Sequence, residues 1–207
     1  MPYPSAPRRL LETLFLCCLL ISNAYADEWS LGTHKPITGD FNGDGIADLL
    51  LQSRDANNLN AIAFGLGNGN FGIAQQRWDA DYLGLGWLTS NLYIGDFNGD
   101  GRSDILLQNQ SSGTHRILLA SASGTFDSVS FNISDAALGL SWSGSASKLI
   151  VADFTGDGRD DVLLQPQHSN GAVSIVTAGS SGNLDQVLQS WAANAYGLNW
   201  TTSLVSL

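Results

Sequence analysis

The sequence has few cysteines, few basic residues and no pattern typical of a helix. Only 2 cysteines occur in 207 residues, and 9 lysines and arginines stand against 19 acidic residues, so the formal net charge is −10. This shortage of positive charge argues against nucleic acid or an anionic membrane as a partner, because both bind basic patches. No segment combines apolar residues at a helical period with capping residues, which argues against a helical fold.

Long apolar runs are missing as well. The longest, from about Leu14 to Ile21, is too short for a membrane-spanning helix, which needs about 20 apolar residues. A basic pair, Arg8-Arg9, precedes this run and Ala24-Tyr25-Ala26 follows it, which is the order of a secretory signal peptide cleaved after Ala26. We therefore expect residues 1–26 to be a signal peptide. A lipid anchor and a retained N-terminal anchor are the alternatives.

Export would place the protein outside the cell or, in a bacterium, in the periplasm or on the cell surface, with no membrane insertion after cleavage. Both cysteines, Cys17 and Cys18, lie in the expected signal peptide, so the mature domain, 27–207, would lack disulfide bonds. Loss of Arg8, Arg9 and Glu12 leaves 7 basic and 18 acidic side chains, a net charge of −11. Something other than disulfide bonds must stabilise such a domain.

What the sequence does contain is one unit repeated three times. The stretch GDFNGDGIADLLLQ begins at Gly39, GDFNGDGRSDILLQ at Gly95 and ADFTGDGRDDVLLQ at Ala152, so the first aspartates are 56 and 57 residues apart. A second motif, G-L-x-W, stays in phase with them. We assign units of about 29–86, 87–141 and 142–200, followed by a C-terminal strand at 201–207.

Each unit has the pattern of strands and turns. The runs DLLLQ, DILLQ and DVLLQ that follow the three loops are short and apolar throughout, as is typical of a strand buried on both faces. One strand precedes each loop, and two more follow, separated by a turn rich in Gly, Asn or Ser. Four short strands per unit predict an all-β, β-propeller-type fold of three tandem four-stranded antiparallel blades.

Three blades are fewer than the four to eight of an ordinary propeller. The segment TTSLVSL after Trp200 resembles the strand that precedes each loop, so it could complete a blade of the same chain or pair with another chain. An incomplete ring completed by self-association or by a partner, an open arc and a compact three-unit fold are all open. We favour the completed ring, because exposed blade edges otherwise invite uncontrolled pairing.

The repeated loops have the pattern D-x-N-x-D-G-x-x-D, with threonine in place of asparagine in the third, and nine of the acidic residues occupy positions 1, 5 and 9. Calcium prefers six to eight oxygen ligands, and alternate side chains of a curled loop can meet on one ion, the curl being permitted by glycine at position 6. An EF-hand is excluded, because position 12 is a leucine rather than a glutamate. A metal-free turn rich in Asp, Asn and Gly is the alternative, and three copies in phase favour calcium.

The unit resembles the FG-GAP/VCBS repeat of integrin-α-type β-propellers over essentially all of Trp29–Leu207. The resemblance implies a loop that joins the first two strands of each blade and binds calcium structurally, about three ions in all. It implies three ligand sets, each using the backbone carbonyl at position 7: Asp40, Asn42, Asp44, Ile46 and Asp48; Asp96, Asn98, Asp100, Arg102 and Asp104; and Asp153, Thr155, Asp157, Arg159 and Asp161. Thr155 departs from the usual residue at position 3 and sets the third loop apart.

Catalytic motifs are missing from the sequence. It has no G-x-S-x-G, H-E-x-x-H or glycine-rich phosphate loop. No nucleophile or metal-ligand spacing surrounds His34, His115 or His168, so we expect these to be surface or turn residues and the protein not to be an enzyme. The 6 tryptophans occupy repeat-phased positions, which favours packing between blades over stacking on a ligand.

The expected function is therefore binding. The chain is interpreted as a secreted calcium-binding repeat protein that acts as an extracellular interaction or adhesion module for a protein or glycan, with a homo-oligomer as one form. A glycan-binding lectin that uses Tyr82 and Tyr196 is the first alternative. An accessory part of a secreted polysaccharide- or lipid-acting enzyme is the second.

Overall fold

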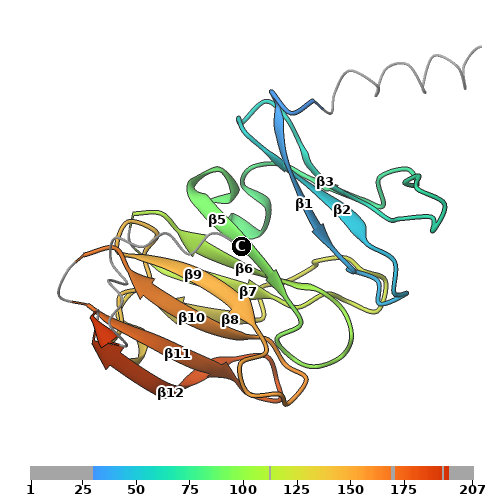
Figure 1. Cartoon of the computed structure of the whole chain (residues 1–207). Coiled ribbons are helices and arrows are strands. Elements are labelled where there is room, and N and C mark those ends of the chain that lie inside the picture. Colours follow the sequence, from blue (N-terminus) through green and yellow to red (C-terminus); the bar gives the residue numbers. More distant parts are fainter. Residues whose placement is uncertain (1–29, 112, 169–170, 193, 196–207) are drawn as a thin grey trace, which may run out of the picture.

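Twelve β-strands in three four-stranded sheets make up the computed structural model of the protein over residues 30–111, 113–168, 171–192 and 194–195 (Figure 1). Each sheet is an antiparallel meander in which strands adjacent in sequence pair with one another. This confirms the expected all-β fold with three tandem blades. Helical structure in the described residues consists of short 3-10 turns, and none of them is long and apolar enough to cross a membrane.

The elements follow the same order in every blade. Blade 1 contains β1 (His34–Gly39), β2 (Asp48–Ser53), β3 (Asn60–Ala63) and β4 (Gln76–Trp78), followed by η1 (Tyr82–Gly84) and η2 (Trp87–Thr89). Blade 2 contains β5 (Ser90–Gly95), β6 (Asp104–Asn109), β7 (Thr114–Leu118) and β8 (Phe131–Ser134), followed by η3 (Ala137–Gly139). Blade 3 contains β9 (Ser147–Ala152), β10 (Asp161–Pro166), β11 (Ala172–Ala178) and β12 (Leu184–Ala192). The strand predicted at 201–207 lies outside the described residues.

The first strand of each blade lines the inner side of an arc. β5 lies between β1 and β9 and contacts both, and the other strands of each blade follow outward from it (Figure 1). The register pairs Gly39 with Asp48, Gly95 with Asp104 and Ala152 with Asp161. Each acidic loop therefore joins the first two strands of its blade, as the family resemblance implied.

Two hydrophobic cores lie between adjacent blades rather than within one blade. The first joins residues such as Leu50 and Ile62 of blade 1 to Ile105 and Leu107 of blade 2. The second contains Leu106 of blade 2. Because side chains alternate across a strand, β6 places its leucines and isoleucine in both cores, which explains why its sequence is continuously apolar.

Buried tryptophans hold the connection from one blade to the next. Trp87 and Trp142 are fully buried, and their indole Nε1 atoms donate to the carbonyls of Tyr82 at 3.1 Å and Ala137 at 2.9 Å. The carbonyl of Trp87 in turn accepts from Gln52 Nε2 of blade 1 at 2.7 Å, and that of Trp142 accepts from the corresponding glutamine of blade 2 at 2.8 Å. At these positions the predicted packing role of tryptophan is confirmed.

Two histidines differ from the sequence-based expectation. His34 and His115 are buried, at 1% and 0% exposure, whereas His168 is exposed as predicted. The reason for His115 is a hydrogen bond: its Nδ1 accepts from the backbone N–H of Asn109 at 3.0 Å, and burial lowers the pKa of its imidazole. The ring also lies 6.4 Å from that of Trp142.

The backbone nitrogen at the position of Asn109 has a different environment in each blade. In blade 1 the N–H of Ser53 donates to Asn60 Oδ1 at 2.9 Å, and Asn60 occupies the position of His115. In blade 3 the corresponding residue is Pro166, which has no N–H, and the acceptor position holds the apolar Val173. A buried donor needs an acceptor, so His115 is a structural hydrogen-bonding residue.

Candidate metal centre in the three loops

The first aspartate of each loop is enclosed by backbone amides. Asp40 Oδ1 accepts from the N–H groups of Gly43 at 2.8 Å and Asp44 at 3.1 Å, and Oδ2 accepts from Gly45 at 2.7 Å. Gly43 and Gly45 have φ values of +75° and +80°, which side-chain-bearing residues rarely adopt. Asp96 and Asp153 accept from the same loop positions. The predicted curl of the loop is present in all three copies.

Positions 3 and 5 are joined in two of the loops. Asn42 accepts from the N–H of Asp44 at 3.0 Å and donates through Nδ2 to the Asp44 carboxylate, also at 3.0 Å. Asn98 and Asp100 repeat this arrangement in the second loop. In the third loop, the Thr155 hydroxyl instead donates to Asp153 at 3.3 Å. The departure seen in the sequence therefore changes the local hydrogen bonding.

The aspartate at position 9 ties each loop to the next hairpin of its blade. Asp48 is fully buried; its Oδ2 accepts from the N–H of Phe41 at 2.8 Å and its Oδ1 from Gly65 at 2.9 Å. Asp104 and Asp161 are equally buried and accept from the equivalent pairs of amides. Both oxygens of these carboxylates already have protein partners.

Burial makes a negative charge unfavourable on the position-9 aspartates of the first two loops. It raises the pKa of Asp48, against hydrogen bonds from Gly65 and Phe41 that lower it. The pKa of Asp104 is raised to about 7, chiefly by burial and also by the negative charges of Asp100 and Asp96, against hydrogen bonds from Ala120 and Phe97 that lower it. A cation near either loop would favour the charged form of its aspartates.

Position 7 supplies a cation in two loops but not in the first. The Arg102 guanidinium donates to the carboxylate of Asp100 and, through Nε, to the Ala120 carbonyl at 3.3 Å. Arg159 makes the same contacts with Asp157 and with the carbonyl of Ala178. The first loop has Ile46 at this position. From the sequence we expected only the backbone carbonyl of position 7 to have a role, although the arginine two residues after the position-5 aspartate was a visible signal.

The donor set of the loops is of the hard-oxygen kind that calcium prefers. Among the described residues, no group of three or more His, Cys, Asp or Glu side chains lies close enough to hold a metal. A calcium ion would therefore depend on mixed oxygens: the carboxylates at positions 1 and 5, the side chain at position 3 and the carbonyl at position 7. These positions are half-buried or exposed, whereas position 9 is buried.

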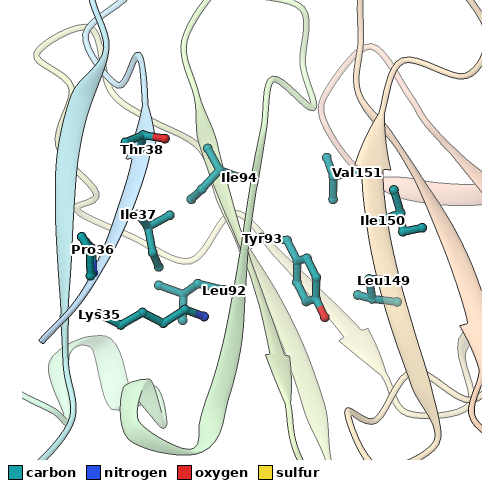
Figure 2. A pocket seen from close by; sticks show the side chains of 10 residues that line it. All are labelled: Lys35, Pro36, Ile37, Thr38, Leu92, Tyr93, Ile94, Leu149, Ile150 and Val151. Atoms are coloured by element: carbon teal, nitrogen blue, oxygen red, sulfur yellow. The ribbon is translucent and has the colours of Figure 1, made fainter. Parts of the chain in front are cut away.

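A groove that no feature of the sequence predicted runs along the inner strands. It has a volume of about 650 Å³ and is lined by residues 35–38 of β1, 92–94 of β5 and 149–151 of β9. Figure 2 shows aliphatic side chains from all three strands around it, with Lys35, Thr38 and Tyr93 as its polar members. Its formation requires three segments more than 50 residues apart to meet, so no local motif marks it.

The fold and loops define a β-propeller-like repeat protein with an acidic loop in each blade. Its sequence matches the model of the FG-GAP-like repeat at residues 40–107 and 96–164, stretches that contain all three loops. The chain belongs to the FG-GAP-like repeat family. None of the curated proteins matches the sequence.

Among solved structures, a lectin from Agrocybe aegerita that recognises non-reducing terminal N-acetylglucosamine is similar to this chain. The two are 25% identical, with a TM-score of 0.55, over 78% of this chain and 39% of the lectin chain. The protein thus spans about two fifths of the length of that relative, and the likeness supports a β-propeller-like interaction module.

Proposed function

We propose that the protein is a secreted interaction module for an extracellular protein or glycan, in which the three acidic loops bind calcium structurally. The observation that carries this proposal is the buried aspartate at position 9. It connects each loop to the hairpin of its blade while lying beside other carboxylates. A cation held by the loop would offset this negative charge and so stabilise the blade.

The loops are not equivalent in this proposal. Bound calcium supplies a positive charge to the carboxylates, and Arg102 and Arg159 already supply one to Asp100 and Asp157. The first loop has no such group, so it depends most on the ion. The third loop combines an arginine with Thr155 and should bind calcium most weakly.

Calorimetric titration of the mature domain with calcium chloride tests the loops. We expect saturation at two to three ions per chain with dissociation constants of roughly 0.1–1 mM, the range of extracellular calcium modules. Asp44→Ala should remove one ion from the stoichiometry, because it deletes the position-5 ligand of the first loop. Asp81→Ala is the matched control, since Asp81 is an exposed acid outside the loops. If calcium gives no saturable heat, the loops are metal-free turns.

A glycan is the second candidate target, favoured by the likeness to a lectin. Tyr82 does not fit the predicted sugar-stacking role, because its hydroxyl donates to the carbonyl of Phe126 at 2.9 Å and its ring packs 6.0 Å from that of Trp78. Tyr196 lies outside the described residues. A sugar site would therefore use other surfaces of the blades.

A glycan array probed with the mature domain in millimolar calcium separates the two targets. Retention on glycans ending in N-acetylglucosamine, lost in excess chelator and competed by the free sugar, is the result expected of a lectin. If the domain binds no glycan on the array, the glycan candidate is excluded and a protein target is left.

A further inference from the structure

Each junction between blades buries a pair of side chains, one from the loop of one blade and one from the last hairpin of the next. Phe41 of blade 1 and Phe126 of blade 2 are fully buried and meet edge-on, with ring centroids 5.8 Å apart. Phe97 of blade 2 and Leu184 of blade 3 lie together in the second core, at 0% and 7% exposure. Both junctions therefore follow one rule.

The two ends of the arc present the separate halves of such a pair. Phe154 is the loop phenylalanine of blade 3 and is 38% exposed, whereas Phe71 is the hairpin phenylalanine of blade 1 and is 48% exposed. Ile73, two residues further along, is 85% exposed. Clustered apolar side chains on a surface are typical of interaction sites. The blade 3 face therefore presents a loop phenylalanine without a hairpin partner from a following blade, and the blade 1 face presents a hairpin phenylalanine without a loop partner from a preceding blade.

A two-point backbone contact accompanies each junction. The N–H of Ser103 donates to the carbonyl of Asp40 at 2.7 Å, and Ser103 Oγ accepts from the Asp40 N–H at 2.9 Å. In the second junction Asp160 replaces Ser103, with distances of 2.7 and 2.8 Å. At the ends of the arc the corresponding residues are Asp153 and Ala47. Ala47 retains its N–H, so one of the two hydrogen bonds can form when these ends meet.

Side-chain sizes at the two ends are also matched. The inner junctions need glycine at the end of the first strand, because a Cβ on Gly95 would lie 2.5 Å from the Val151 side chain. Blade 3 has Ala152 at this place and so carries an extra methyl group. The residues of blade 1 that would face it are Ala47, which is smaller than Ser103 and Asp160 at this place, and Thr38, which is smaller than Ile94 and equal in size to Val151. The extra methyl group of Ala152 on the blade 3 face is therefore matched by the smaller side chain of Ala47 on the blade 1 face.

We propose that two copies of this chain join head to tail, the blade 3 face around Phe154 of one copy covering the blade 1 face around Phe71 of the other. Two such junctions, related by a twofold axis, close a ring of six blades, within the four to eight usual for propellers. The groove along β1, β5 and β9 then faces its counterpart in the second copy. The length of the similar lectin is consistent with a ring of this size, since the stretch that matches this protein is only 39% of the lectin chain.

The mass of the mature domain in millimolar calcium, measured by light scattering after size exclusion, tests the proposal. We expect a dimer. Phe71→Asp and Phe154→Asp should each weaken dimerisation by at least about 100-fold, since an aspartate in the centre of an apolar interface removes an anchoring residue and buries a charge. Both phenylalanines are exposed in the single chain, so the melting profile of each dilute variant should match that of the dilute native domain.

Mixing the two variants separates a head-to-tail ring from other dimers. The mixture retains one intact junction, formed by the Phe154 face of one variant and the Phe71 face of the other, and should recover part of the dimer. Leu138→Asp is the control, because Leu138 is 41% exposed and belongs to η3, the connection from blade 2 to blade 3. A monomeric native domain, or a dimer that either variant leaves intact, would overturn the proposal.

Discussion

Removal of calcium should lower the midpoint of thermal unfolding of the mature domain by about 10–20 °C. Each site with free calcium at about 20-fold excess over its dissociation constant contributes roughly 1.8 kcal/mol to the free energy of unfolding. Three sites together supply about 5 kcal/mol, which is comparable with the whole stability of many domains. For a domain of this length, 1 kcal/mol shifts the midpoint by about 2–4 °C. With no cysteine after residue 18, these ions would take the place of disulfide bonds.

The measurement is a thermal melt of residues 27–207 in millimolar calcium and again in excess chelator. Calcium added back should restore the midpoint, and magnesium at the same concentration should not, because magnesium demands stricter octahedral geometry and dehydrates reluctantly. Identical melts in calcium and in chelator would show that the loops do not stabilise the fold through a metal.

The loss of thermal stability on removal of calcium should be larger at high pH than at low pH. Burial raises the pKa of Asp104 from its ordinary 3.8 to about 7, so the calcium-free folded state takes up a proton that the unfolded state does not bind over this interval. The stability of the calcium-free domain therefore falls as pH rises from about 4 to about 7. The chelator should lower the midpoint more at pH 8 than at pH 5.5.

Replacing Asp104 by alanine should destabilise the domain by about 3 kcal/mol even in chelator. The carboxylate accepts from the N–H groups of Phe97 at 3.0 Å and Ala120 at 2.8 Å, and alanine would leave both donors without a partner. Each buried donor left unsatisfied costs about 1–3 kcal/mol, and relief of the buried charge offsets part of the total. Asp104→Asn retains one acceptor and should cost about half as much. Chemical denaturation in chelator measures the free energy of unfolding of the native domain and of the two variants.

Asp100→Ala is the matched control for this substitution. Asp100 is an exposed loop acid that contacts Arg102 at the surface, and exposed ion pairs contribute about 0–1 kcal/mol. In chelator it should therefore cost much less than Asp104→Ala. Equal costs would mean that the buried carboxylate does not hold the loop to the hairpin. Both Asp104→Ala and Asp100→Ala should also lower the affinity of the second loop for calcium.

Local features of the chain were predictable because they depend on residues close together in sequence. The curl around Asp40 needs only Gly43, Asp44 and Gly45, and the short strands follow from apolar runs bounded by turns. Because the three units share one sequence pattern, a prediction made for one unit applied to the other two. Even the different hydrogen bonding at position 3 of the third loop was visible as the change to Thr155.

Features that need distant segments were missed or only partly predicted. The burial of His115 depends on the hydrogen bond that its Nδ1 accepts from the N–H of Asn109 on the paired strand, and the sequence does not mark His115 as buried. The guanidinium of Arg102 finds the Ala120 carbonyl 18 residues away, across the blade. Periodicity identifies that a side chain faces inward but not which polar group it meets there.

The sequence by itself determined the number of blades, their strand order and the acidic loops, because these are set by hydrogen bonds and side-chain alternation within one unit. The tertiary structure decided which faces of those blades are covered. Phe41, Phe97 and Phe154 occupy the same place in three nearly identical loops, yet the first two are fully buried and the third is 38% exposed. The difference arises because burial of each loop phenylalanine depends on the hairpin of the following blade, which lies more than 80 residues along the chain, and not on the loop itself.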